Sequence, residues 1–199
     1  MLDILLVILI SYAIGNFSTS YILGKLIKKT DIRTKGSGNA GATNALRVFG
    51  KKIAIITFLL DALKGVVAVI IGEMILGYTG ALIAGVFAVI GHDFPVALKF
   101  KGGKGIATTI GAATFINPIP AIIAIIIGLI IIIKTKYVSL GSVSAISLVP
   151  FIALLIVHPF DLKYILFLVA LALLAIFRHK SNIKRLLNGE ESKIGQKAK

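Results

Sequence analysis

Long apolar runs alternate with short polar segments along the chain, and this pattern predicts membrane-spanning helices. A helix needs roughly 20 mainly apolar residues to cross a hydrocarbon core about 30 Å thick. Six segments meet or approach this length, and a seventh, residues 105–117, is apolar but shorter. The predicted segments are residues 4–23, 53–71, 80–98, 105–117, 118–133, 140–157 and 162–177. We expect one integral membrane domain over residues 1–199, with a flexible tail at 189–199.

The fourth segment would reach only about 20 Å at roughly 1.5 Å per residue. Either it begins earlier, near Phe100, or its N-terminus lies below the membrane surface. The distribution of Lys and Arg favours counting it as a crossing. With seven crossings, 20 of the 22 Lys and Arg residues fall on one side, which the positive-inside rule makes cytoplasmic. We therefore predict an all-α fold of seven transmembrane helices, with the N-terminus outside and the C-terminus in the cytoplasm.

Composition narrows the class of protein further. Of the 199 residues, 57% are apolar and only 15% are charged, yet the formal net charge is +14. A nucleic-acid-binding protein would spread such charge over an ordinary composition, so we expect no nucleic acid partner. The chain has no Cys, which excludes disulfides, thiolate metal sites and a cysteine nucleophile.

The first cytoplasmic loop, KGSGNAGATNALRVFGKK at 35–52, mixes glycines with Ser, Asn, Thr and Arg47. Glycines let consecutive backbone N–H groups converge on an anion, and arginine can bind a phosphate with two hydrogen bonds. Residues 36–41 also match G-x-G-x-x-G, but a dinucleotide fold requires a preceding strand, where this chain has a membrane helix and a basic linker. The plainer alternative is a flexible linker.

The second loop, GHDFPVALKFKGGKGIATTIG at 91–111, interleaves Lys99, Lys101 and Lys104 with glycines before a short helix. A glycine-rich basic turn that leads into a helix N-terminus is a second arrangement suited to anions. Alternatively, these lysines only fix topology and contact lipid headgroups. His92 could be a structural cap.

Two further cytoplasmic segments carry polar candidates. Ser139, Ser142 and Ser144 lie near a predicted helix start, where capping explains at least one of them. His179 and Asn182 are three residues apart and would share a face if the last helix continues. The alternative for that segment is a snorkelling basic cluster.

Asp61 and Lys64 are three residues apart inside an apolar segment. Charged groups are costly in a bilayer, so we expect this pair to bond to each other or to line a polar cavity.

Five blocks resemble the bacterial acyl-phosphate:glycerol-3-phosphate acyltransferases, which are small integral membrane enzymes. The blocks are GSGNAGATNALRVFG (36–50), DALKG (61–65), GHDFPVALKFKGGKG (91–105), YVSLGSVSA (137–145) and FRHKSNIKRLLNGEE (177–191). The resemblance covers nearly the whole chain. It implies that an acyl group moves from acyl phosphate to the 1-hydroxyl of glycerol 3-phosphate by direct attack, with the donor phosphate as a proton acceptor and no acyl-enzyme.

The resemblance also implies roles for residues. Glycerol 3-phosphate would be bound by Arg47, Lys104, His179 and Asn182, and whether His179 is a base or only a ligand stays open. Ser142 is a further polar candidate. The acyl-phosphate loop would comprise Gly36, Ser37, Gly38, Asn39, Ala40, Gly41, Thr43 and Asn44.

We expect no metal or cofactor, a monomer in the bacterial inner membrane with its active face in the cytoplasm, and contact with membrane lipid. A soluble enzyme that produces acyl phosphate is a further expected partner. The alternative function is transport of an anionic phosphorylated metabolite. Transporters place polar sites near the bilayer midplane, and only Asp61 and Lys64 fit that pattern here.

Overall fold

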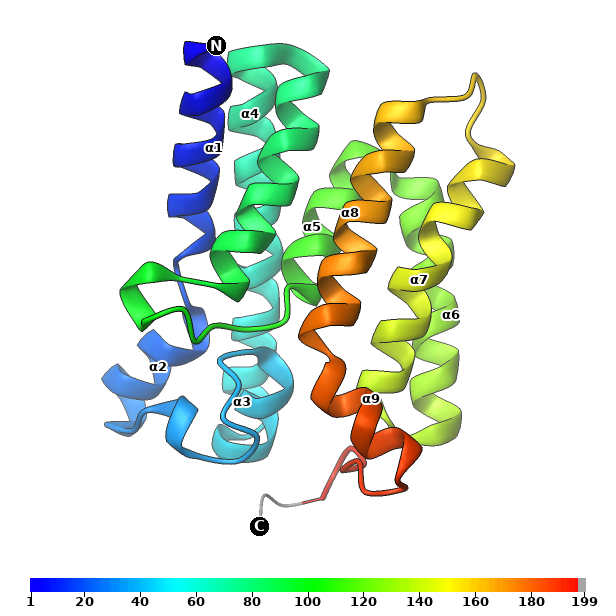
Figure 1. The fold of residues 1–199 in the computed structure, drawn as a ribbon. Helices are drawn as coiled ribbons and strands as arrows, with labels where there is room; N and C mark the ends of the chain where they lie inside the picture. The colour runs from blue at the N-terminus through cyan, green and yellow to red at the C-terminus, as the bar shows by residue number, and fades with distance from the viewer. Residues whose placement is uncertain (197–199) are drawn as a thin grey trace. The chain divides into compact units, whose positions relative to one another are not determined.

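The computed structural model describes residues 1–196, and these residues form helices and loops without a strand. They divide into two compact units (Figure 1). Unit 1 holds residues 1–112 together with residues from 195, and unit 2 holds residues 113–194, so the boundary lies within α5. The helices that begin in unit 1 are α1 (Leu2–Gly15), α2 (Thr19–Lys28), η1 (Ile32–Thr34), α3 (Ala42–Phe49), α4 (Lys51–Asp93), η2 (Val96–Leu98) and α5 (Ile106–Ile116).

The 43-residue helix α4 folds back on itself at Leu76 and Gly77, whose backbone angles are not helical. Gly77 has a φ of +58°, which a residue without a side chain adopts readily. Close to the bend, a methyl group on Gly72 or Gly80 would collide with the carbonyl oxygen of the other. The two arms therefore run antiparallel, and α1 packs against α4 (Figure 1). They correspond to the predicted segments 53–71 and 80–98.

The first predicted segment, residues 4–23, lies within one candidate membrane span, Leu2–Lys28, but its helix is interrupted. Helix α1 ends at Gly15 and α2 begins at Thr19. The backbone carbonyls of Gly15 and Phe17 instead accept hydrogen bonds from the Lys64 side chain of α4. Because this partner is remote in sequence, the apolar pattern gives no sign of the break.

The third predicted segment and the candidate span Lys51–Leu98 both end at residue 98, but the regular helix ends earlier. Helix α4 ends at Asp93, and Phe94 leaves the helical region with φ −131° and ψ 58°. Pro95 explains this ending, because a proline ring disfavours helical geometry in the residue before it. The fourth segment does not begin near Phe100: α5 starts at Ile106 and is 11 residues long, about 16 Å.

Unit 2 continues after the end of α5 with four helices. They are α6 (Pro118–Thr135), α7 (Val138–Ile156), α8 (Leu162–Arg178) and α9 (Lys180–Leu187). Helix α7 packs against α6 and α8, and α9 packs against α7 and α8. Helices α8 and α9 meet at 61°.

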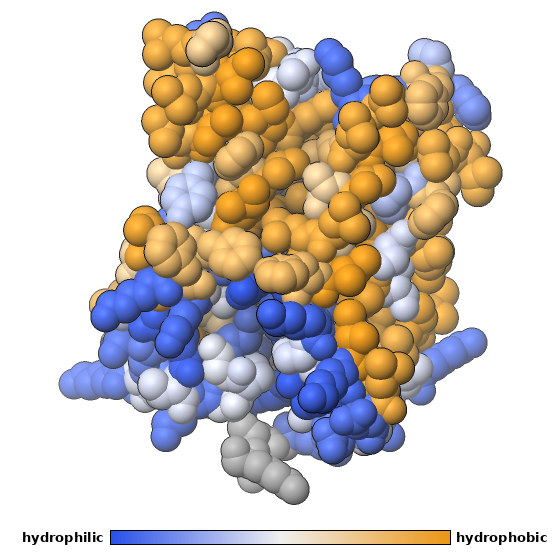
Figure 2. Space-filling model, viewed as in Figure 1, coloured by the Kyte–Doolittle hydropathy of each residue, from blue (hydrophilic) through white to orange (hydrophobic). Residues whose placement is uncertain are grey.

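Apolar surface runs along most of the long helices, as expected for a protein in lipid. In unit 1, hydrophobic residues cover α1 and α4, whereas hydrophilic residues gather over α2, η1 and α3 (Figure 2). By length and composition, four helices within residues 1–196 could cross a membrane, or five if α8 and α9 form one span. That count treats α4 as one span, although its two arms run antiparallel.

Candidate functional site

The polar loop before α3, residues 35–41 and called loop A below, is held in shape by Asn44. Its buried side-chain nitrogen lies 3.0 Å from the carbonyl oxygens of Lys35 and Asn39 and 3.3 Å from that of Ile32. Its oxygen Oδ1 accepts a hydrogen bond from the backbone N–H of Ser37 at 2.9 Å. Asn44, predicted as a substrate-binding residue, therefore organises the loop itself.

The internal bonds of loop A decide which backbone donors can meet an anion. The N–H groups of Ser37, Gly38 and Ala40 already donate to Asn44, Lys35 and Gly102, respectively. The N–H groups of residues 41–43 begin α3, where helix geometry provides no partner within the helix. The start of α3 is thus the part of this segment best suited to bind a phosphate.

The second polar loop, residues 94–105 and called loop B below, is bonded to loop A. The carbonyl oxygen of Gly102 accepts from the backbone N–H of Ala40 at 3.4 Å and from the Asn39 side chain at 3.3 Å. Gly103 donates to the carbonyl of His92 at 3.0 Å. Lys104, which is partly buried, follows directly. The fold therefore brings two segments predicted to bind anions into direct contact.

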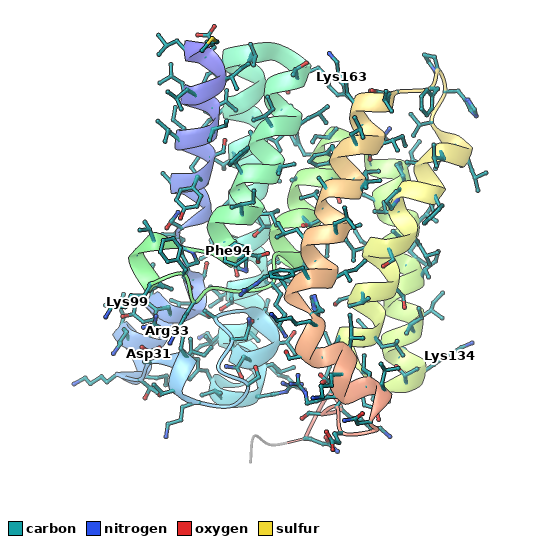
Figure 3. All side chains as sticks on the ribbon, viewed as in Figure 1. Asp31, Arg33, Phe94, Lys99, Lys134 and Lys163 are labelled. Atoms are coloured by element: carbon teal, nitrogen blue, oxygen red, sulfur yellow. The ribbon has the colours of Figure 1, made fainter. Side chains whose placement is uncertain are left out.

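An ion pair at η1 provides a second link between the segment that joins α2 to α3 and loop B. Arg33 bonds to Asp31 at 2.8 Å and donates to the carbonyl of Leu98 at 2.9 Å (Figure 3). The hydrogen bond from Arg33 lowers the pKa of the Asp31 carboxyl, although partial burial opposes this shift. Sequence reasoning did not single out this pair.

The expected pairing within α4 is confirmed. Asp61 Oδ1 lies 3.1 Å from Lys64 Nζ, and both side chains are buried. Since these charges bond to each other, the only sequence feature that favoured a transporter has a structural explanation.

In unit 2, the polar residues gather around Glu191. Its carboxylate accepts from Ser139 at 3.1 Å, from Asn182 at 2.8 Å and from Arg185 at 2.7 Å. Burial alone raises the pKa of Glu191, but the hydrogen bonds from Asn182, Arg185 and Ser139 outweigh it, so the pKa lies below its ordinary value. Glu191 lies in the segment expected to be a flexible tail, of which residues 197–199 fall outside the described part.

His179 is buried at the bend between α8 and α9. Its Nδ1 lies 2.8 Å from the carbonyl oxygen of Ala175. A carbonyl can only accept, so we assign the hydrogen to Nδ1, and Nε2 is the acceptor of the neutral ring. The last helix does not continue straight to Asn182, because the chain bends at His179.

The predicted site residues fall into both units. Unit 1 contains residues 36–44, Arg47 on α3 and Lys104, whereas unit 2 contains Ser142 on α7, His179 and Asn182. The sequence pattern did not indicate that three side chains form hydrogen bonds with other polar side chains. They are His92, Ser139 and Glu191. Each lies in a block that carries the family resemblance, which was the available signal.

Comparisons with known proteins agree over most of the chain. A family model described as glycerol-3-phosphate acyltransferase matches residues 5–189. A glycerol-3-phosphate acyltransferase of Alkaliphilus metalliredigens is 51% identical over 193 residues, which is 97% of each chain. One of Thermoanaerobacter pseudethanolicus is 53% identical over 189 residues, 95% of this chain and 94% of the relative.

Two solved structures share the fold. The crystal structure of PlsY (YgiH), an integral membrane glycerol 3-phosphate acyltransferase, matches in its glycerol 3-phosphate form with a TM-score of 0.90 and 34% identity over 96% of both chains. Its lysophosphatidic acid form matches with a TM-score of 0.86 and 32% identity, over 96% of this chain and 95% of the other.

Proposed function

The chain belongs to the glycerol-3-phosphate acyltransferase family, and from this premise we propose that it moves a fatty acyl group from acyl phosphate to the 1-hydroxyl of glycerol 3-phosphate. The products would be lysophosphatidic acid and inorganic phosphate. The observation that carries this proposal is the match to an integral membrane acyltransferase whose structures hold glycerol 3-phosphate and lysophosphatidic acid. These two molecules are the acceptor and the product of the proposed reaction.

The proposed chemistry needs no nucleophile from the protein. The glycerol hydroxyl oxygen attacks the acyl carbonyl carbon and forms an ester bond. The bond between that carbon and the phosphate oxygen breaks, and the departing phosphate takes the hydroxyl proton. Acyl phosphate is an activated donor, so positioning and charge stabilisation supply most of the catalysis. The absence of Cys from the sequence agrees with this route.

In unit 1, we assign the phosphate of the acyl donor to loop A and the backbone N–H groups of residues 41–43. Asn39 and Thr43 would add polar contacts. We assign glycerol 3-phosphate to Arg47 and Lys104, because guanidinium and ammonium groups donate hydrogen bonds to phosphate oxygens.

In unit 2, we assign glycerol 3-phosphate contacts to His179 and Asn182, with Ser142 as a further polar group. The hydrogen bond from His179 Nδ1 to the Ala175 carbonyl fixes the orientation of the ring that would meet the substrate, whether as base or as ligand. The bonds of Ser139 and Asn182 to Glu191 would hold this region in place.

We further propose seven crossings, with the N-terminus outside and the C-terminus in the cytoplasm. The antiparallel arms of α4 would cross separately, and the short α5 would complete the count. Within unit 2, Lys134 and Lys163 lie at opposite ends of the helices (Figure 3), which supports their assignment to opposite sides. The protein would act as a monomer in the bacterial inner membrane, on its cytoplasmic face, and receive acyl phosphate from a soluble enzyme.

The test of the reaction uses purified full-length protein with acyl phosphate and labelled glycerol 3-phosphate. We expect labelled lysophosphatidic acid and an equal amount of inorganic phosphate. A parallel reaction with acyl-CoA should give no product above background. Equal activity with acyl-CoA, or no product with acyl phosphate, would contradict the proposal.

The test of the residue assignments compares neighbouring cations. Arg47→Ala and Lys104→Ala should each lower kcat/KM at least tenfold, about 1.4 kcal/mol of transition-state stabilisation. Lys101→Ala is the matched control, because Lys101 is an exposed lysine of the same loop. Near-native activity in both Arg47→Ala and Lys104→Ala would refute the assignments.

A further inference from the structure

Three ionisable side chains that contact one another are buried in α4, and the buried carboxylate of Asp93 also acts on Lys64. Asp61 and Lys64 come from the first arm of α4 and His92 from the end of the second arm. Their exposed fractions are 1%, 6% and 5%, respectively. Burying an ionisable group is unfavourable unless it has hydrogen-bonding or charged partners. The contacts of these three side chains therefore show which parts of the fold they stabilise.

Lys64 holds the break between α1 and α2. Its Nζ lies 3.1 Å from the carbonyl oxygen of Gly15 and 2.6 Å from that of Phe17, at the end of α1. Asp61 accepts a hydrogen bond from the Thr19 hydroxyl at 3.0 Å, at the start of α2. A cation at a helix C-terminus and an anion at a helix N-terminus both complement the helix dipoles. The ion pair thus stabilises both sides of the break.

His92 connects this pair to loop B. Its Nδ1 lies 2.8 Å from Lys64 Nζ and 3.8 Å from Asp61 Oδ1, so Lys64 is its hydrogen-bond partner. A paired ammonium has only donors, so Nδ1 accepts and Nε2 carries the hydrogen. Nε2 abuts Gly103, where a methyl group would collide with it. The imidazole therefore fixes the position of Gly103 together with the bond from the Gly103 N–H to the His92 carbonyl.

From Gly103 the contacts continue to loop A. The adjacent carbonyl of Gly102 accepts from Ala40 and Asn39. Ala40 directly precedes Gly41, the N-cap of α3, and Gly103 directly precedes Lys104. An unbroken series of contacts therefore runs from the buried ion pair to both segments assigned to phosphate.

We propose that Asp61, Lys64 and His92 are positioning residues for acyl transfer. They hold Gly102 and Gly103 so that the start of α3 and Lys104 keep the spacing that the two phosphorylated substrates require. This proposal rests on the proposed function. None of the three residues touches substrate; they act through loops A and B.

The first experiment is Lys64→Met, which keeps the length of the side chain and removes its charge. We expect kcat to fall at least tenfold while KM for glycerol 3-phosphate changes less than threefold, because misplaced reactants react slowly even when bound. Glu73→Gln is the control, an exposed charged residue of the same helix, and should leave kcat unchanged. A kcat of Lys64→Met within threefold of wild type would overturn the proposal.

The double variant Asp61→Asn/Lys64→Met separates positioning from folding. The single change Lys64→Met leaves the buried Asp61 carboxylate without its cation, whereas the double change removes both members of that ion pair. We expect Tm to recover relative to Lys64→Met while kcat stays low, because His92 still lacks its partner. Recovery of both Tm and kcat would mean that the cluster only supports the fold.

Hydrogen exchange gives a readout independent of activity. In Lys64→Met, amides in residues 35–44 and 99–105 should exchange faster than in wild type, while those of α7 should not change. Unchanged exchange in both loops would overturn the positioning role. Faster exchange together with a wild-type protein that makes no lysophosphatidic acid would support the positioning role and reject the proposed function.

Discussion

In the loops, single polar side chains form the hydrogen bonds to backbone groups that the backbone itself forms in the helices. Asn44 donates to three nearby carbonyls and accepts from one N–H group. Lys64 donates to two carbonyls that have no helical partner because the helix breaks after α1. Glu191 similarly collects three donors in unit 2. A buried polar group that loses its partner costs about 1–3 kcal/mol, so each of these side chains should be hard to replace.

The carboxylate of Glu191 should make stability depend on pH. Its pKa in the folded protein lies below the ordinary value of 4.5, because the donors that surround it outweigh the effect of burial. The stabilisation is present above the ordinary pKa and is lost as the pH falls through the lower folded value. Thermal unfolding in detergent should therefore show Glu191→Gln well below wild type in Tm at about pH 6, with a smaller difference at about pH 3.5.

Glu190→Gln is the matched control, because Glu190 is the exposed neighbour. It should unfold with wild type at both pH values. A difference between Glu191→Gln and wild type that does not shrink in acid would contradict the assignment of a lowered pKa to Glu191.

At the scale of the elements, the loops and residues that we assign to substrate binding lie where helices begin or end. Helix α3 begins at the end of loop A, α5 begins at the end of loop B, and α8 ends at the bend that contains His179. Helix α4 changes direction at Leu76 and Gly77, and its ends carry Lys51 and the Asp93 that follows His92. The packing of the long helices therefore determines where loops A and B and His179 lie.

The bend of α4 should depend on glycine at position 77. Gly77 has φ +58° and ψ −154°, a region almost restricted to glycine, and nothing lies within 4 Å of an added methyl group. Gly77→Ala should therefore destabilise the protein by about 1–3 kcal/mol through backbone strain alone. The measurement is the free energy of unfolding in detergent, with the exposed Met74→Ala within about 0.5 kcal/mol of wild type as control. Equal stability of Gly77→Ala and wild type would show that the bend tolerates a side chain.

At the scale of the whole molecule, charge and apolar surface determine orientation. The chain carries a net charge of +14, and 20 of its 22 Lys and Arg residues lie in segments that we assign to the cytoplasm. The same segments contain loops A and B and the region around His179. We propose that one set of positive charges both fixes the orientation in the membrane and attracts the phosphorylated substrates.

The orientation can be tested with single cysteines, because the chain has none of its own. In intact cells, a membrane-impermeant thiol reagent should label Lys163→Cys but should label Lys134→Cys only after the membrane is opened. A reporter fused after Lys199 should be cytoplasmic. Labelling of both cysteines from the same side would exclude the seven-crossing arrangement.

Sequence reasoning succeeded where the determinants are local. The lengths of the apolar runs predicted the main helices and the short α5. The spacing of two charges, three residues apart in an apolar run, predicted the Asp61–Lys64 pair. Pro95 is likewise a local signal for the end of α4, but apolar residues continue beyond it to Leu98 and obscure that signal. The break after Gly15 and the bond between Ser139 and Glu191 depend on partners more than 45 residues distant, so no local pattern indicates them.

The capping of α1 by Lys64 has a consequence for biogenesis. The carbonyl of Gly15 is synthesised 49 residues before the side chain that finally satisfies it. At roughly 5–20 residues per second, α1 spends about 2–10 s without its cap while the ribosome continues. During that interval, water or lipid headgroups must donate hydrogen bonds to the carbonyls at the end of α1. The break between α1 and α2 therefore gains its final hydrogen bonds only when the first arm of α4 has packed against it.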